Sequence, residues 1–172
     1  DIGSLVDAHR VLTLGPVSKA GALERMVASL TATVPGLPFG VVYSAVCARE
    51  REVSTRVASA LAMPHARLAG LARCHVVLAR CRAGIDYEDD GDEPVRLLAM
   101  VVGPLEEPDL FLSVLAELAR VLSSQAIRER AITADEPAEV LRLFFQAPAA
   151  PERGGDRVSD AVLRAAAATA EQ

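Results

Sequence analysis

The residues with the clearest chemical potential lie in a short segment that ends in a Pro-His step. Three pairs of residues in this segment attract attention, Arg49-Glu50, Ser54-Thr55 and Pro64-His65. Proline disfavours the helical conformation in the residue before it, so we expect His65 to end a short extended segment that holds it outward. An imidazole has an unperturbed pKa of about 6.5, so a neutral ring nitrogen is available at neutral pH. The pattern indicates nucleophilic catalysis by His65.

The spacing of this segment resembles the active-site motif of the fructose/mannitol-type IIA domains of the bacterial sugar phosphotransferase system, including their nitrogen-regulatory branch. The residues in register with that motif are Arg49, Glu50, Ser54, Thr55, Ala62, Pro64 and His65, without a gap. The resemblance covers residues 5–146. It implies that His65 accepts a phosphoryl group from a histidine phosphocarrier protein and passes it on. It also implies that no organic cofactor or metal is required.

Phosphoryl transfer needs an in-line nucleophile and donors for the phosphoryl oxygens, more than covalent work by the protein. Ser54 and Thr55 can supply hydroxyl and backbone N–H donors. Arg49 can supply a planar guanidinium that suits phosphate. Arg56 is either an additional phosphate ligand or a solvated arginine. Glu50 either orients Arg49 or is a plain charge at a helix end, and the second interpretation is slightly favoured.

Two departures from the family pattern bear on activity. The positions that are usually glycine are Arg56, Ala58, Ala60 and Ala66 here. An alanine there is tolerated at negative φ and strained at positive φ. Phe111 stands where family members commonly carry a second histidine near the phosphorylated one, and a phenyl ring cannot donate a hydrogen bond. Phe111 is either a residue beside His65 that weakens support of the phosphoryl group, or, more simply, core packing at an apolar helical position.

Alternating helices and strands must position this segment. Hydrophobic periodicity and turn residues predict strands at 10–14, 74–81 and 96–102, and helices at 18–33, 39–50, 108–122, 126–132 and 137–145. Helices on both sides of buried strands predict an α/β fold, a three-layer α-β-α sandwich, and the resemblance implies a mixed sheet of about five strands. We expect an IIA-type domain over residues 1–146. Residues 147–172 are predicted to form a flexible linker and an Ala-rich terminal helix from Ser159.

The composition argues against several classes of function. The net charge is −5 and the basic residues are scattered, which disfavours nucleic-acid binding. No apolar stretch is long enough for a membrane span. The cysteines Cys47, Cys74 and Cys81 are odd in number and widely spaced, as is typical of a reducing cytoplasm. Cys74 and Cys81 end one predicted strand and should point to opposite faces, so a shared metal is not expected. The acidic segment 86–93 lacks the glutamate of a calcium loop and is interpreted as a solvated turn.

These observations leave two functions open. The first is a cytoplasmic IIA-type phosphotransferase that is phosphorylated on His65. No permease or IIB pattern occurs in the chain, which favours a regulatory role of the nitrogen branch over direct sugar uptake. Its partners would be the phosphocarrier, docking around His65, and a IIB domain or a regulatory target protein. The second is a IIA-fold sensor or interaction module with weak or no turnover, which Phe111 and the lost glycines favour.

Overall fold

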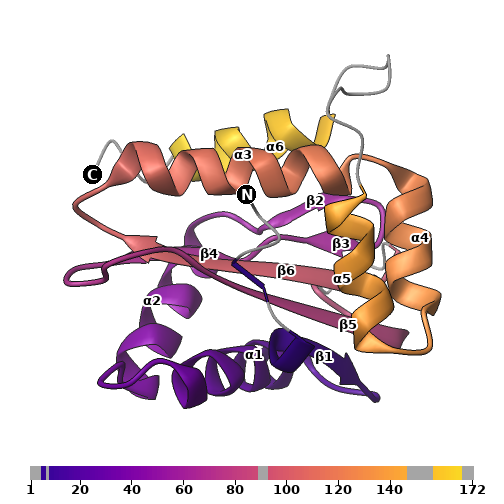
Figure 1. Cartoon of the computed structure of the whole chain (residues 1–172), viewed down its shortest axis with the longest axis horizontal. Helices are drawn as coiled ribbons and strands as arrows, with labels where there is room; N and C mark the ends of the chain where they lie inside the picture. Colours follow the sequence, from indigo (N-terminus) through magenta and orange to yellow (C-terminus); the bar gives the residue numbers. More distant parts are fainter. Residues whose placement is uncertain (1–4, 7, 89–92, 147–156, 168–172) are drawn as a thin grey trace.

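A mixed β-sheet forms the middle layer of the protein (Figure 1). The structure is a computed structural model that describes residues 5–6, 8–88, 93–146 and 157–167. Its strands are β1 (Val11–Leu14), β2 (Arg56–Ala58), β3 (Leu61–Ala62), β4 (His65–Leu68), β5 (His75–Ile85) and β6 (Val95–Pro104). They are ordered β1-β5-β6-β3-β2, and β4 also pairs with β6. β5 and β6 are antiparallel, whereas β1 runs parallel to β5, and β3 and β4 run parallel to β6.

The short strands β3 and β4 lie in line along one edge of β6. Residues 61–62 pair with 97–98, and residues 65–68 pair with 101–104. The line is interrupted at Met63-Pro64, because proline has no N–H to donate to the ladder. The sheet therefore has six strands but is only five positions wide. This arrangement reconciles the observed sheet with the five strands expected.

Helices cover both faces of the sheet (Figure 1). One face carries α1 (Lys19–Thr33) and α2 (Phe39–Glu52), and the other carries α3 (Pro108–Leu122), α4 (Gln125–Thr133), α5 (Pro137–Phe145) and α6 (Arg157–Ala167). A short 3-10 helix, η2 (Ala8–Arg10), precedes β1. The predicted three-layer α-β-α sandwich is confirmed. The side chain of Ser18 caps α1 by accepting a hydrogen bond from the Gly21 N–H at 3.0 Å.

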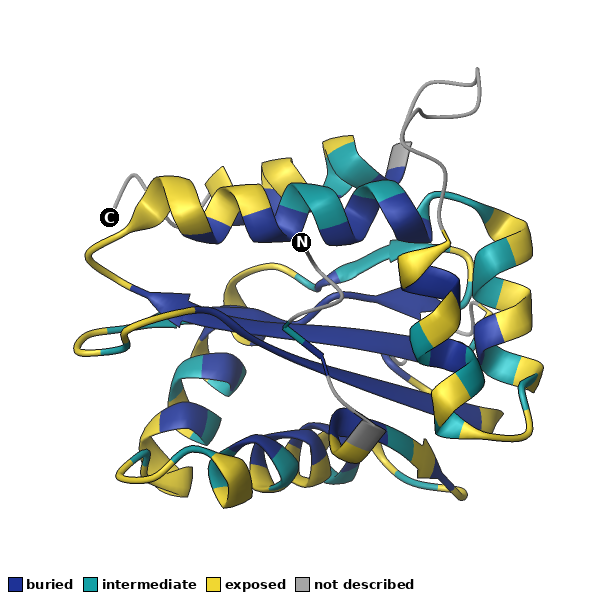
Figure 2. Cartoon of the chain, in the orientation of Figure 1, coloured by how far each residue is buried: buried dark blue, intermediate teal, exposed yellow. Residues whose placement is uncertain are grey.

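The sheet is apolar on both faces and separates two hydrophobic cores. Along β5, Val76 and Leu78 belong to the core beneath α3–α6, whereas Val77 belongs to the core beneath α1 and α2. The central strands are accordingly buried along most of their length (Figure 2). Cys74 lies in the first core and Cys81 in the second. The prediction that these cysteines point to opposite faces is confirmed.

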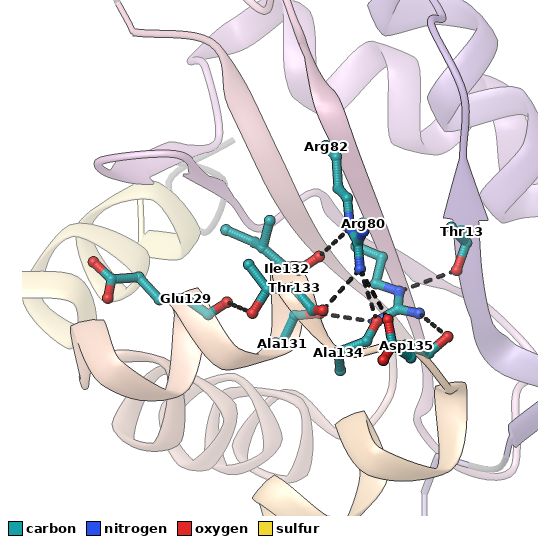
Figure 3. A network of polar contacts seen from close by, with 9 residues as sticks. All are labelled: Thr13, Arg80, Arg82, Glu129, Ala131, Ile132, Thr133, Ala134 and Asp135. Carbon is teal, nitrogen blue, oxygen red and sulfur yellow. Dashed lines mark hydrogen bonds and ion pairs between the residues drawn. The ribbon is translucent and has the colours of Figure 1, made fainter.

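A buried arginine joins the sheet to the end of α4 (Figure 3). Arg80 of β5 is 3% exposed. Its guanidinium donates to Thr13 Oγ1 at 3.0 Å and to the carbonyl oxygens of Ala131 at 3.2 Å, Asp135 at 3.4 Å and Ala134. The last carbonyls of a helix have no partner within the helix, so Arg80 supplies the missing donors. The sequence did not predict this role, because Arg80 stands in a run that reads as an apolar strand.

Several predictions concern residues outside the described part of the chain. The predicted linker falls largely on residues 147–156, and the centre of the acidic turn on residues 89–92, neither of which is described. The terminal helix α6 begins at Arg157, slightly before the predicted start at Ser159. The division into 1–146 and 147–172 stays a prediction.

Taken singly, none of the described helices is long and apolar enough to cross a membrane. α3 and α4 meet the criterion only as a pair, which is bent by 85° at its break.

Candidate active site

His65 is the first residue of β4 and directly follows Pro64. It is not held outward as the sequence predicts, since it is only 3% exposed. The cause is tertiary: β4 pairs with the central strand β6, and the ring of Phe111 packs beside the imidazole. His65 Nδ1 lies 2.8 Å from the carbonyl oxygen of Met63. A carbonyl can only accept, so Nδ1 carries the proton of the neutral ring and Nε2 keeps its lone pair.

The His65 ring is neutral at physiological pH. Burial lowers the pKa of His65 to about 4, because the imidazolium would lose its hydration. The Met63 carbonyl opposes that shift, Arg49 reinforces it, and Glu50 opposes it again. Nε2 is buried and has no hydrogen-bond partner among the described residues. An unprotonated and unpartnered Nε2 is the form of the ring that can act as a nucleophile.

A pocket of about 230 Å³ opens beside His65. Its lining consists of Ala45, Ala48, Arg49 and Glu52 from α2, His65, Ala66 and Arg67 from β4, and Leu105 and Phe111 from the chain after β6. Sequence reasoning missed the place of Arg67 in this lining. The signal was available, because residues i and i+2 of a strand share a face and Arg67 follows His65 by two positions. The pocket therefore borders two guanidinium groups, one carboxylate and one neutral imidazole.

Phe111 lies beside His65, as expected of a residue that replaces a second histidine. The two ring centroids are 6.0 Å apart with an interplanar angle of 51°. Phe111 also belongs to the core beneath α3, so it both packs and borders the site. The close approach depends on Gly103, since a Cβ at that position would lie 2.6 Å from Phe111 Cδ2. A larger residue at position 103 would collide with the phenyl ring and with Cys74 Sγ.

We expect Phe111→His to speed phosphoryl transfer to His65 or to lengthen the lifetime of the phosphohistidine. An imidazole at this position can donate a hydrogen bond to a phosphoryl oxygen, whereas a phenyl ring cannot. A charge-assisted hydrogen bond contributes about 1.5–3 kcal/mol, equivalent to roughly tenfold or more in rate or lifetime. Phe111→Leu, which offers no donor, is the control. Unchanged kinetics in a folded Phe111→His protein would make Phe111 a packing residue only.

Arg49 stands in the last turn of α2 and is buried. Its Nη1 donates to the carbonyl oxygen of Val53 at 3.2 Å, and its Nη2 donates to the carbonyl oxygen of Ala165 in α6. Its Nε is also buried and lacks a partner among the described residues. Arg49 thus borders the pocket, as the motif predicts, but its two Nη groups are bonded to backbone carbonyls of the protein itself.

Glu50 is buried, and its interpretation as a plain helix-end charge is wrong. Its carboxylate accepts from the Thr55 N–H at 3.0 Å and from Thr55 Oγ1 at 2.6 Å, and it forms an ion pair with Lys19 at 3.1 Å. Thr55 Oγ1 also lies 3.0 Å from the hydroxyl of Tyr87, over whose ring Lys19 Nζ sits at 4.1 Å. Glu50 therefore holds the turn after α2 in place. The Thr55 hydroxyl is engaged in this network rather than directed into the pocket.

The remaining motif residues are placed away from the pocket lining. Ser54 Oγ accepts from the Arg56 N–H at 3.3 Å, and Arg56 in β2 forms an ion pair with Glu88 at 3.6 Å. Arg56 is therefore neither a solvated arginine nor, in this conformation, a residue of the pocket.

Of the alanines that replace glycines, Ala60 has φ 60°. The alanine at position 60 is the strained one, because a Cβ disfavours the left-handed region.

Both the sequence and the structure of the chain are similar to those of phosphotransferase system IIA proteins. Residues 5–147 match the family described as phosphoenolpyruvate-dependent sugar phosphotransferase system, EIIA 2. The chain is 28% identical over 120 residues to the PTS system fructose-specific EIIA component of Haloferax volcanii, covering 70% of this chain and 78% of that protein. The crystal structure of nitrogen regulatory protein IIA-Ntr from Neisseria meningitidis has a TM-score of 0.76 at 27% identity, covering 83% of this chain and 98% of that one. A chain in the complex of IIA mannitol with phosphorylated IIB mannitol from Escherichia coli is similar in fold, with a TM-score of 0.68 at 19% identity, covering 81% and 96%.

Proposed function

Because this chain belongs to the EIIA 2 family of the phosphoenolpyruvate-dependent sugar phosphotransferase system, we propose that it accepts a phosphoryl group on His65 and passes it on. The observation that carries the choice of residue is the state of the His65 ring. The Met63 carbonyl holds the ring proton on Nδ1, which leaves Nε2 unprotonated and without a partner among the described residues. His65 also lines the pocket. Among the side chains that line the pocket, only this imidazole offers a nitrogen with a free lone pair at neutral pH.

The proposed step needs no proton transfer at His65. Nε2 attacks the phosphorus of a phosphohistidine on the phosphocarrier, so that the new N–P bond forms as the N–P bond to the carrier breaks. The carrier's imidazole leaves with the electron pair of that bond. The proton on His65 Nδ1 remains in place, bonded to the Met63 carbonyl. In the second half of the reaction an acceptor attacks the phosphorus, and Nε2 recovers its lone pair.

The test is phosphorylation of the purified chain by the general enzymes of the system. The protein is incubated with phosphoenolpyruvate, the general phosphotransferase enzyme and a histidine phosphocarrier, and its intact mass is followed with time. We expect the addition of one phosphoryl group that is labile in acid and stable in base, located on the peptide that contains His65. A chain that remains unmodified while a known IIA protein in the same mixture is phosphorylated would contradict the proposal.

The proposed partners are the phosphocarrier and a downstream protein that receives the phosphoryl group or responds to it. The likeness to IIA-Ntr supports a regulatory role, and the complex of IIA mannitol with phosphorylated IIB mannitol supports a IIB domain as a further partner. We place the protein in the cytoplasm. Its cysteines Cys47, Cys74 and Cys81 are free, which suits a reducing compartment.

A second candidate function is a IIA-fold sensor or interaction module with little turnover. The observation that favours it is the pair of residues beside His65: Phe111 offers no hydrogen bond, and the Nη groups of Arg49 are bonded to carbonyls. A sensor would bind the phosphocarrier without accepting phosphate. Binding measured by calorimetry together with the absence of phosphorylation would favour this function over transfer.

We expect Arg49→Ala to slow phosphorylation more than Arg67→Ala does. Arg49 is buried at the pocket, where a guanidinium is little screened by water, whereas Arg67 is half-buried and lies over the Phe111 ring at 6.0 Å. Loss of a phosphate-directed donor in such a site lowers the rate by about a hundredfold to a thousandfold. The measurement is the initial rate of phosphorylation by the phosphocarrier. Equal rates for Arg49→Ala and the wild type would remove Arg49 from the site.

A further inference from the structure

We propose that helix α6 is a clamp that withholds Arg49 from the phosphoryl site. This inference rests on the proposed function of His65 and concerns the regulation of that site. The clamp has two parts: an apolar face that docks α6 on the domain, and a carboxyl end that takes up the guanidinium of Arg49.

The docking face of α6 consists of residues at four-residue spacing. Val158, Val162 and Ala166 lie on one side of the helix and belong to the hydrophobic core shared with α3. Val162 is fully buried, whereas Leu163 beside it is 38% exposed. α6 contacts α3 and β2, so it lies on the α3 face of the sheet at the edge that β2 forms. The match to the EIIA 2 family ends at residue 147, before this helix begins.

The carboxyl end of α6 is placed on Arg49. The last carbonyls of a helix lack partners within the helix and carry the negative end of its dipole, so a guanidinium there is doubly favourable. Arg49 Nη2 donates to the carbonyl oxygen of Ala165, within the last turn of α6. Ala165 is itself buried, so this hydrogen bond is sheltered from water. The bond joins residues that are 116 positions apart in the chain.

The clamp and a phosphoryl group compete for the same side chain. A guanidinium binds phosphate with its forked N–H groups, and the Nη groups of Arg49 are bonded to Ala165 and Val53. Arg49 already borders the pocket, but its Nη2 can turn toward a phosphoryl oxygen only when α6 gives it up. The docked state therefore slows phosphoryl acceptance, and release of α6 by a partner would activate it. By linkage, a phosphoryl group that holds Arg49 would also favour release of α6.

The test uses the full chain with changes confined to α6. Val162→Glu places a carboxylate in the buried contact with α3 and should detach the helix. Ala161→Pro breaks the helix by removing an internal hydrogen bond and adds no charge to the core. Leu163→Glu changes the exposed face of the same helix and is the matched control. Detachment is verified by hydrogen exchange of the α6 amides.

Two measurements separate the clamp from phosphoryl transfer. The first is modification of Arg49 by phenylglyoxal, located by peptide mass, which requires no partner protein. Detachment should raise that rate by about tenfold, while the rate at Arg67 should not change. The second is the initial rate of phosphorylation by the phosphocarrier, which should rise by about tenfold in the two detached variants and not in Leu163→Glu. An unchanged rate at Arg67 also shows that the domain remains folded.

The outcomes distinguish the clamp from the function on which it rests. If detachment leaves the reactivity of Arg49 unchanged, the clamp is refuted, and phosphorylation of His65 can still stand. If Arg49 becomes reactive but the phosphorylation rate stays the same, α6 covers the arginine without regulating the site, and the proposal is also overturned. If no chain is phosphorylated, the wild type included, the proposed function fails, while a rise in Arg49 reactivity would still support the clamp.

Discussion

Replacement of His65 by alanine should abolish phosphorylation by the phosphocarrier. Phosphate is carried on a nitrogen that forms a covalent bond, so no neighbouring group can substitute for the ring. The other polar residues of the pocket lining are Arg49, Arg67 and Glu52. A guanidinium has no free lone pair with which to attack phosphorus, and a carboxylate would give an acyl phosphate that is labile in base. The expected result is complete loss of the acid-labile phosphoryl group, measured as intact mass after incubation with phosphoenolpyruvate and the general enzymes.

Two further variants serve as controls that separate loss of the nucleophile from loss of the folded structure. Because His65 is buried, His65→Ala leaves a cavity and should lower the free energy of unfolding by about 1–3 kcal/mol, more than an exposed loop histidine would. His65→Gln keeps more of the volume and should give the same chemical result. His9→Ala removes an exposed histidine and should be phosphorylated at the wild-type rate. Phosphorylation of folded His65→Ala or His65→Gln on another histidine would contradict the site assignment.

Replacement of Arg80 by alanine should lower the free energy of unfolding by about 3 kcal/mol, since hydrogen bonds to a charged group contribute about 1.5–3 kcal/mol each and do not add in full. Arg80 is buried and joins Thr13 of β1 to the carbonyl oxygens at the end of α4 (Figure 3). Its loss removes the Arg80 donor from the buried Ala131 carbonyl, whereas the half-buried Ala134 carbonyl still accepts from Arg82. Chemical denaturation followed by circular dichroism measures the change.

Arg82 provides a matched control for Arg80. It stands two positions along β5 and also donates to carbonyl oxygens of α4, including that of Thr133 at 2.7 Å. Its side chain is 59% exposed, so water can replace it as a donor. Arg82→Ala should therefore lower the free energy of unfolding by less than about 1 kcal/mol. If both substitutions lower the free energy of unfolding equally, burial is not the reason why the Arg80 contacts stabilise the protein.

Much of the fold was predictable, because its elements are specified by local patterns. The helix from Pro108 to Leu122 has apolar residues at three- and four-residue steps, and its predicted bounds are those of α3. The strands β5 and β6 are longer than predicted, since their ends contain Gly84 and Gly103-Pro104, which are typical of turns but continue the strands here. The short strands β2, β3 and β4 were not predicted. They contain only two to four residues each and exist through pairing with β6 and with each other.

By itself the sequence predicted that Arg49, His65 and Phe111 lie together, through the motif spacing and through Phe111 in place of a second histidine, and all three line the pocket. It did not predict Arg67 there, and Ser54, Thr55 and Arg56 lie outside the lining. Residue types and spacing persist whatever the chain does in space, so a motif can be recognised without a structure. Burial, pairing and competition between partners arise only when distant segments meet. The tertiary structure alone therefore decided that His65 is buried and neutral, and that the Nη groups of Arg49 are bonded to Val53 and to Ala165.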